Sequence, residues 1–192
     1  SDIAMNDDYA REQDAEDPLR ASRDDFHIPR HNDVEMAYFC GNSLGLQPKG
    51  ARACVDEVMD KWARDAVEGH FREPAPWMPY HELVRDALAG VVGAQPSEVV
   101  AMNSLTANLH LMMVSFYQPT IERTAILIEA GAFPSDRHAV ESQLKYRGLP
   151  PKHCLIEIEP DQPDGTFSMA AIERAIAEHG KRLALILWPG VQ

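Results

Sequence analysis

Two segments of the sequence combine residue types that can hold an anionic, planar ligand. The first is residues 102–108, Met-Asn-Ser-Leu-Thr-Ala-Asn, which follow a short apolar run and open into a sequence of helical periodicity. A helix that begins there presents free backbone N–H groups and a positive dipole end, and the Thr106 hydroxyl adds a donor. These groups predict a site for an anion such as a phosphate. The alternative is that Ser104 or Thr106 only caps the helix.

The second segment is residues 130–136, Ala-Gly-Ala-Phe-Pro-Ser-Asp, after the next apolar run. Pro134 and Ser135 are expected to begin a helix, with Phe133 offering a flat face and Asp136 a charge for a cationic ring nitrogen. An aromatic platform, a carboxylate and a phosphate-binding helix terminus at one sheet edge are what pyridoxal phosphate requires. Alternatively, Asp136 complements the helix dipole and Phe133 forms a hydrophobic staple.

The histidines give a weaker signal. His27 and His31 have metal-ligand spacing, but Pro29 lies between them and no third ligand follows nearby, so we expect solvated loop residues and no metal. His110 lies in an apolar stripe and is expected to pack within its helix. His70 is expected at a helix end before a proline-rich loop, where a substrate-facing role and a dipole-complementing role are both open.

The elements that would position these residues follow from apolar periodicity. Apolar runs at residues 99–102, 125–128, 154–158 and 183–188 predict strands, and helical spacing between them predicts the intervening helices. This βαβαβαβ order predicts the α/β class, with a mostly parallel open sheet and helices on both faces. In such sheets ligands bind beyond the carboxyl ends of the strands.

The N-terminal part of the sequence predicts three further features. Residues 1–31 are polar and predict an extended arm or a mobile tail, residues 51–66 predict an amphipathic helix, and residues 71–79 predict a proline-rich loop before a second helix. We therefore expect an acidic arm at residues 1–37, a turn and helices at 38–97, and the first half of an α/β domain at 98–192. Residues 183–188 resemble a buried central strand, which suggests the N-terminal part of a longer protein.

Composition excludes several partner classes. Among 192 residues the net charge is -12, and residues 1–36 alone hold eleven acidic residues against four arginines, so we expect no nucleic-acid partner. No run approaches the ~18 apolar residues of a membrane span, and the acidic N-terminus is unlike a signal peptide. Three cysteines without a Cys-x-x-Cys pair are typical of reduced thiols, so we expect a cytoplasmic protein.

Four ordered blocks of the sequence resemble the kynureninase family of fold-type-I pyridoxal-phosphate enzymes. They are YFCGNSLGLQPK at residues 38–49, GHFREPAPW at 69–77, MNSLTANLHLMM at 102–113, and EAGAFPSD at 129–136 with AVESQL at 139–144. The resemblance implies a homodimer that hydrolyses the Cβ–Cγ bond of L-kynurenine or 3-hydroxykynurenine, giving anthranilate or 3-hydroxyanthranilate and L-alanine. This reaction belongs to tryptophan catabolism and NAD biosynthesis.

The resemblance also implies roles for individual residues. Phosphate contacts fall to Leu105 and Thr106, ring contacts to the segment Phe133, Pro134, Ser135 and Asp136, and substrate contacts to Asn42, Ser43 and His70. None of the five lysines matches the family's cofactor-bearing lysine, which is expected after Gln192. The alternatives are another fold-type-I enzyme, such as a class-V aminotransferase or a desulfurase, and a catalytically silent fragment or binding module.

Overall fold

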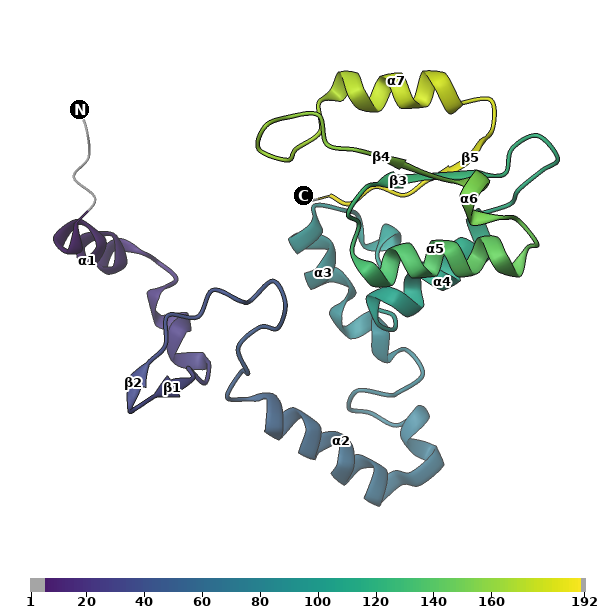
Figure 1. Cartoon of the computed structure of the whole chain (residues 1–192). Coiled ribbons are helices and arrows are strands. Elements are labelled where there is room, and N and C mark those ends of the chain that lie inside the picture. The colour runs from purple at the N-terminus through teal and green to yellow at the C-terminus, as the bar shows by residue number, and fades with distance from the viewer. Residues whose placement is uncertain (1–5, 191–192) are drawn as a thin grey trace. The chain divides into compact units, whose positions relative to one another are not determined.

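The computed structural model describes residues 6–190 and divides the chain after Leu83 into two compact units (Figure 1). Each unit is described on its own. The division into an arm at residues 1–37, a turn and helices at 38–97 and an α/β domain at 98–192 stays a prediction. No helix among the described residues combines the length and the apolarity that crossing a bilayer requires.

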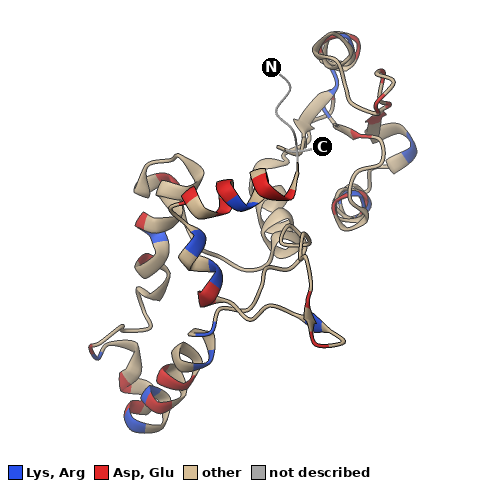
Figure 2. Ribbon diagram, turned by 90° about the vertical axis from the view of Figure 1, so that its left-hand side faces the viewer, with Lys and Arg blue, Asp and Glu red and all other residues tan. Residues whose placement is uncertain are grey.

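The first unit begins with helix α1 (Asp7–Glu16), so the expectation of an extended or mobile segment at residues 1–31 is wrong for this stretch. Asn6 caps the helix by accepting the Tyr9 N–H at 2.9 Å, and Asp7 and Asp8 lie in the first turn, where they complement the helix dipole. These local interactions stabilise a helix that buries no residue, which apolar periodicity cannot predict. Figure 2 shows the charged positions along it.

Short elements follow α1. They are the 3-10 segment η1 (Arg20–Asp25) and an antiparallel hairpin of strands β1 (Arg30–His31) and β2 (Val34–Glu35). Helix α2 (Ala51–Asp65) confirms the predicted amphipathic helix. The 3-10 segment η2 (Ala66–His70) extends it to the predicted loop, and η3 (Tyr80–Val84) ends the loop.

The second unit contains a parallel three-stranded sheet in the order β4-β3-β5, formed by β3 (Ala125–Glu129), β4 (Leu155–Ile158) and β5 (Leu183–Ile186). Helices α4 (Leu105–Phe116) and α5 (Pro134–Tyr146) lie on one face and α7 (Met169–His179) on the other (Figure 1). The α/β class with helices on both faces is confirmed. The remaining elements are α3 (Arg85–Val92), η4 (Pro96–Glu98) and α6 (Pro151–Cys154).

The predicted strand at residues 99–102 is wrong. Val99 has an extended backbone (φ -122°, ψ 136°), yet no described strand pairs with this segment, and the exposed fraction of Val100 is 54%. An extended segment becomes a strand only through the hydrogen bonds of a neighbouring strand, which a local sequence pattern does not reveal.

The ends and placement of two other strands also differ from the prediction. Cys154 belongs to α6 rather than to β4, and β5 ends at Ile186 rather than at residue 188. Within the described sheet β5 is an edge strand, and the central position belongs to β3.

Strand β3 is the centre of the core. Ile126 and Ile128 pack with Met113, Val140 and Leu144 of α4 and α5, whereas Ala125 and Leu127 pack on the other face with Ile158 and Leu183. Because side chains alternate along a strand, burial on both faces explains why the β3 sequence is apolar throughout rather than alternating.

Tyr117, which follows α4, ties this core to the start of β3. Its side chain is fully buried, and its hydroxyl donates to the carbonyl oxygen of Thr124 at 2.6 Å. Burial raises the pKa of the Tyr117 phenol to about 12.

We predict that Tyr117→Phe lowers the free energy of unfolding by about 0.5–1.5 kcal/mol at neutral pH, because one buried hydrogen bond is lost. The folded pKa lies above the unfolded value near about 10, so Tyr117 lowers wild-type stability as pH rises from about 10 to 12. Denaturant unfolding of the wild type and the variant measures both effects. Tyr146→Phe, at a tyrosine that is 85% exposed, is the control. Equal stability and equal pH dependence would contradict the assignment.

Candidate active site

A cavity of about 430 Å³ lies beyond the carboxyl ends of β3 and β5, where an open parallel sheet binds ligands. Helices α4 and α5 both begin at this cavity. Its lining residues are Leu105, Leu109, Ile128, Glu129, Ala132, Phe133, Asp136, Arg137, Leu187, Trp188, Pro189 and Gly190. The structure thus brings together Leu105, Phe133 and Asp136 from the two segments that the sequence singled out.

The beginning of α4 supplies backbone donors. Ser104 is the N-cap, and its hydroxyl accepts the Ala107 N–H at 3.4 Å, so Ser104 rather than Thr106 takes the capping role. The first N–H groups of a helix have no partner within the helix, which leaves those of Leu105 and Thr106 for an anion. Thr106 is half-buried next to the cavity-lining Leu105.

The turn from β3 into α5 presents the aromatic ring and the carboxylate. Gly131, at φ 79°, allows the sharp turn, and Phe133 follows as the N-cap residue with Pro134 in the first turn. The Phe133 side chain is 70% exposed and lines the cavity, so it is available to a flat ligand rather than used as a hydrophobic staple. The Ser135 hydroxyl lies 3.3 Å from Oδ1 of Asp136.

Arg137 is a cavity residue that the sequence did not single out. Its Nε donates to Oε1 of Glu157 at 3.0 Å, and it also pairs with Glu141. The hydrogen bond from Arg137 to Glu157, which lies on β4, is the main cause that raises the pKa of the guanidinium. The available signal was the Arg137 and Glu141 pair at helical spacing, but the Glu157 partner depends on the fold.

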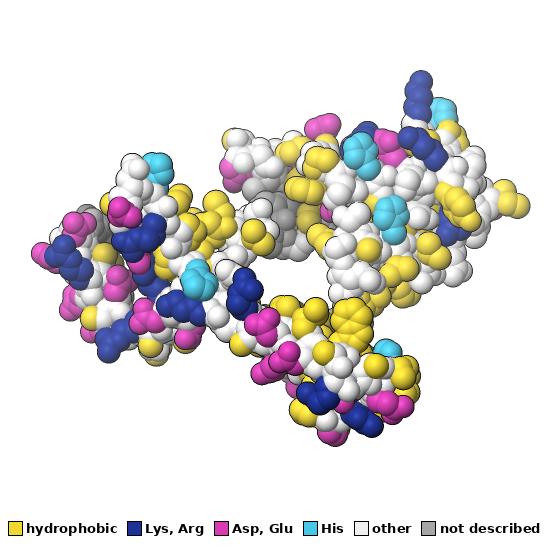
Figure 3. Space-filling model, turned by 90° about the horizontal axis from the view of Figure 1, so that it is seen from below, with side chains coloured by type: hydrophobic (Ala, Val, Ile, Leu, Met, Phe, Trp, Pro, Cys, Tyr) yellow, Lys and Arg dark blue, Asp and Glu magenta, His cyan; other side chains and the backbone are white. Residues whose placement is uncertain are grey.

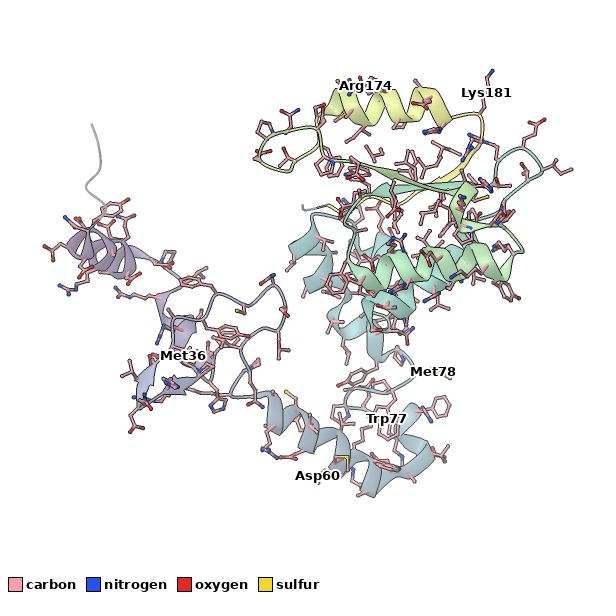
Figure 4. The ribbon with its side chains drawn as sticks, viewed as in Figure 1. Met36, Asp60, Trp77, Met78, Arg174 and Lys181 are labelled. Carbon is pink, nitrogen blue, oxygen red and sulfur yellow. The ribbon has the colours of Figure 1, made fainter. Side chains whose placement is uncertain are left out.

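The three lysines of the second unit lie away from the cavity. Lys145 is in the last turn of α5, Lys152 in α6 directly before β4, and Lys181 directly before β5. All three positions belong to the amino edge of the parallel sheet, opposite the cavity. Figure 4 shows Lys181 projecting outward at the end of α7.

The predicted substrate residues belong to the first unit. Asn42 and Ser43 are exposed in a turn, where the N–H groups of Ser43 and Leu44 both donate to the carbonyl oxygen of Cys40 at 2.9 and 3.1 Å. His70 is exposed at the end of η2, and its ring meets the Trp77 ring edge-on at 5.4 Å. The placement therefore leaves all three side chains accessible.

His110 packs as expected. It is half-buried on α4, and its Nδ1 lies 3.4 Å from Nε2 of Gln143 on α5. It joins two helices of one layer and does not line the cavity, which supports a structural role for this histidine.

The cavity residues fit pyridoxal phosphate chemically. The beginning of α4 offers N–H donors for a phosphate, the exposed Phe133 ring offers a stacking surface, and Asp136 offers a charge for a ring nitrogen. The residues that line the cavity include no lysine that could bond to the aldehyde, so they would supply only one part of such a site.

The open parallel sheet places the chain among the α/β proteins, and its cavity lies at the carboxyl edge, where sheets of this kind bind ligands. No protein-family model matches the chain. It is 67% identical over 184 residues to a kynureninase of Xanthomonas oryzae pv. oryzae (strain PXO99A), a match that covers 96% of this chain and 44% of that protein. A kynureninase of Xanthomonas euvesicatoria pv. vesicatoria (strain 85-10) is 68% identical over 179 residues, covering 93% of this chain and 42% of that protein.

The chain is thus a homologue of the kynureninases and spans less than half the length of the curated relatives it matches. The family resemblance of the four sequence blocks is confirmed. This homology implies the fold of the fold-type-I pyridoxal-phosphate enzymes, of which the described sheet is a part.

We predict that Thr106→Ala weakens binding of pyridoxal phosphate by about 1–3 kcal/mol, because a hydrogen bond to a charged group is lost. The variants are made in a full-length protein, which here means a protein that contains these residues and is as long as the kynureninase relatives. Turnover at saturating cofactor should change less, since a phosphate contact persists throughout the reaction. Spectroscopic titration measures the affinity, with Thr120→Ala, an exposed threonine after α4, as the control. Unchanged affinity would remove Thr106 from the site.

For a full-length protein that shares the activity named for its relatives, we predict that His70→Phe raises KM for kynurenine or changes the preference between kynurenine and 3-hydroxykynurenine, with cofactor affinity intact. A polar group matched to a polar substrate group discriminates strongly, whereas an apolar pocket distinguishes such analogues weakly. Measuring kcat/KM for both compounds in the full-length protein decides between the two roles of His70. If His70 only complements the helix end, KM and the ratio stay the same and stability falls by a fraction of ~1 kcal/mol.

Proposed function

We propose that the protein is a kynureninase, which uses pyridoxal phosphate to hydrolyse the Cβ–Cγ bond of L-kynurenine and 3-hydroxykynurenine. The observation that carries the proposal is the 67% identity to kynureninases over 96% of the chain. The cavity at the carboxyl edge supports it, because it gathers Leu105, Phe133 and Asp136.

In this proposal the described residues hold and polarise the cofactor. Leu105 and Thr106 bind its phosphate through the beginning of α4, and the Phe133 ring stacks on the pyridine. Pro134 and Ser135 shape the turn that presents Asp136, whose charge keeps a proton on the ring nitrogen. When bound, the cofactor supplies an electron sink for the negative charge that develops on the substrate.

The substrate contacts are proposed for the first unit. The side chains of Asn42, Ser43 and His70 are polar and exposed, so each could contact the amino ketone or the carboxylate of kynurenine. This assignment distinguishes a kynureninase from other fold-type-I enzymes, because those enzymes share the cofactor chemistry of Thr106 and Asp136 but act on other substrates.

Two alternatives remain testable. A class-V aminotransferase or a desulfurase would use the same cavity, and the high identity to kynureninases argues against both. A silent fragment or a binding module would need no cofactor, and the chemical fit of the cavity argues against it. We further propose a cytoplasmic homodimer that acts in tryptophan catabolism and NAD biosynthesis.

The direct experiment supplies L-kynurenine and pyridoxal phosphate to the full-length protein. We expect anthranilate and L-alanine in equal amounts, measured by fluorescence and by amino-acid analysis. Transfer of the amino group to a keto acid would favour an aminotransferase. Absence of any reaction with kynurenine would contradict the proposal.

We predict that Asp136→Asn slows turnover more than Thr106→Ala does, because it removes the charge that stabilises the protonated ring. The matched control is Asp86→Asn, which removes a first-turn aspartate from α3. An aspartate that serves only the helix dipole contributes about 0.3–1 kcal/mol to stability and nothing to turnover. Single-turnover kinetics beside a thermal melt separates the two roles. A normal rate with a lowered melting temperature would overturn the assignment of Asp136.

A further inference from the structure

The segment after α2 folds back on itself and carries both His70 and Trp77. The Trp77 N–H donates to the Gly69 carbonyl oxygen at 3.2 Å, and the Met78 N–H donates to that of His70 at 3.1 Å. The Trp77 ring lies so close to Gly69 that a Cβ there would be 2.8 Å from it. Figure 4 shows Trp77 and Met78 in this segment. The position of His70 therefore depends on the closure of residues 69–78, called the His70 loop below.

Much of the His70 loop is exposed to solvent. Phe71 and Met78 are 66% and 65% exposed, and Pro74 and Pro76 have no N–H group to give to a backbone ladder. Figure 3 shows that apolar side chains gather at places on this face of the molecule. On α2, Val55, Met59 and Trp62 are more than half exposed. Apart from the Trp77 ring, the loop therefore depends on polar interactions.

Lys61 of α2 supplies the main polar interaction. This lysine is only 6% exposed, and its ammonium donates to the carbonyl oxygens of Arg72, Pro74 (2.6 Å) and Ala75 (2.9 Å). An ammonium has three N–H donors, and all three find an acceptor on the loop backbone. Burial of a charge is costly unless it is hydrogen-bonded, so this arrangement ties the lysine and the loop to each other.

An ion pair also connects α2 to the same part of the loop. Asp65, one helical turn after Lys61, is 7% exposed, and its carboxylate pairs with Arg64 at 2.9 Å and with Arg72 at 3.3 Å. Hydrogen bonds from Arg64 and Arg72 hold the Asp65 pKa below its usual value. Arg72 is thus held through its carbonyl oxygen by Lys61 and through its guanidinium by Asp65.

We propose that Lys61 is a positioning residue, whose buried ammonium gathers three carbonyl oxygens of the His70 loop and so sets the place of His70 and Trp77 for substrate recognition. The substrate part of this inference rests on the proposed function. The hold on the loop does not, since it follows from the contacts within the first unit alone.

The first test measures the hold without any substrate. Lys61→Met in the full-length protein keeps an unbranched side chain of nearly the same length and removes its donors. We expect hydrogen exchange at the Trp77 and Met78 amides to accelerate about tenfold or more, and trypsin to cut faster after Arg72, with exchange in β3 unchanged. Lys181→Met, at an exposed lysine, should change neither. Unchanged exchange in Lys61→Met would overturn the proposal.

Amine acetylation of the wild-type protein gives a readout that survives a failure of the variant to fold. Lys61 should react at least about tenfold more slowly than exposed Lys49 and Lys181, because its ammonium is buried and hydrogen-bonded. Equal reactivity of Lys61 and these two lysines would overturn the proposed hold on the loop.

The second test asks whether Lys61 acts through His70. Lys61→Met should raise KM for kynurenine about tenfold, with a smaller change in kcat and unchanged cofactor affinity, and Lys61→Arg should restore part of the loss. In the His70→Phe background the same change should have little further effect on KM, because the two residues share one role. Additive effects would overturn the positioning role.

A wild type that does not cleave kynurenine overturns the proposed function and the substrate part of this inference. The hydrogen-exchange result still decides whether Lys61 holds the loop.

Discussion

Burial of β3 on both faces is the constraint on which the second unit depends. Its four buried residues, Ala125, Ile126, Leu127 and Ile128, divide between two packed layers, so α4 and α5 must cover one face and α7 the other. The chain then has to leave the sheet at Glu129, and the turn through Gly131 brings Phe133 and Asp136 to the edge where α4 begins. The positions of the cavity and of Phe133 and Asp136 beside it therefore follow from the burial of β3.

The first unit is organised by a different balance of forces. Its two most buried side chains on α2 are the charged Lys61 and Asp65, whereas apolar Val55, Met59 and Trp62 are more than half exposed. Hydrogen bonds and ion pairs to a proline-rich backbone give a loop a defined shape even where few apolar side chains are buried. A loop held this way can keep His70 at the surface, where a substrate can reach it. A histidine in a packed core would be out of reach.

Sequence periodicity predicted the elements whose stability comes from packing and missed those that depend on distant partners. Helices α2, α4, α5 and α7 and strands β3, β4 and β5 were predicted, because their apolar residues repeat at helical spacing or form short runs. Helix α1 was missed because its stability is local and polar, and residues 99–102 were assigned as a strand although no described strand pairs with them. At the site, Phe133 and Asp136 follow the end of β3, and Leu105 begins a helix whose start the sequence indicated, so all three could be predicted. The Glu157 partner of Arg137 and the loop carbonyls around Lys61 depend on the fold.

The central proposal is that Leu105, Thr106, Phe133 and Asp136 hold the phosphate and the ring of pyridoxal phosphate, and that residues 1–192 do not supply the lysine that bonds to it. Lys61 is bound to the His70 loop, and Lys145, Lys152 and Lys181 lie at the amino edge of the sheet. The most direct measurement reduces the full-length protein with borohydride in the presence of pyridoxal phosphate and maps the labelled peptide. The account predicts one labelled lysine outside residues 1–192, and stoichiometric label on any of the five lysines within them would contradict it.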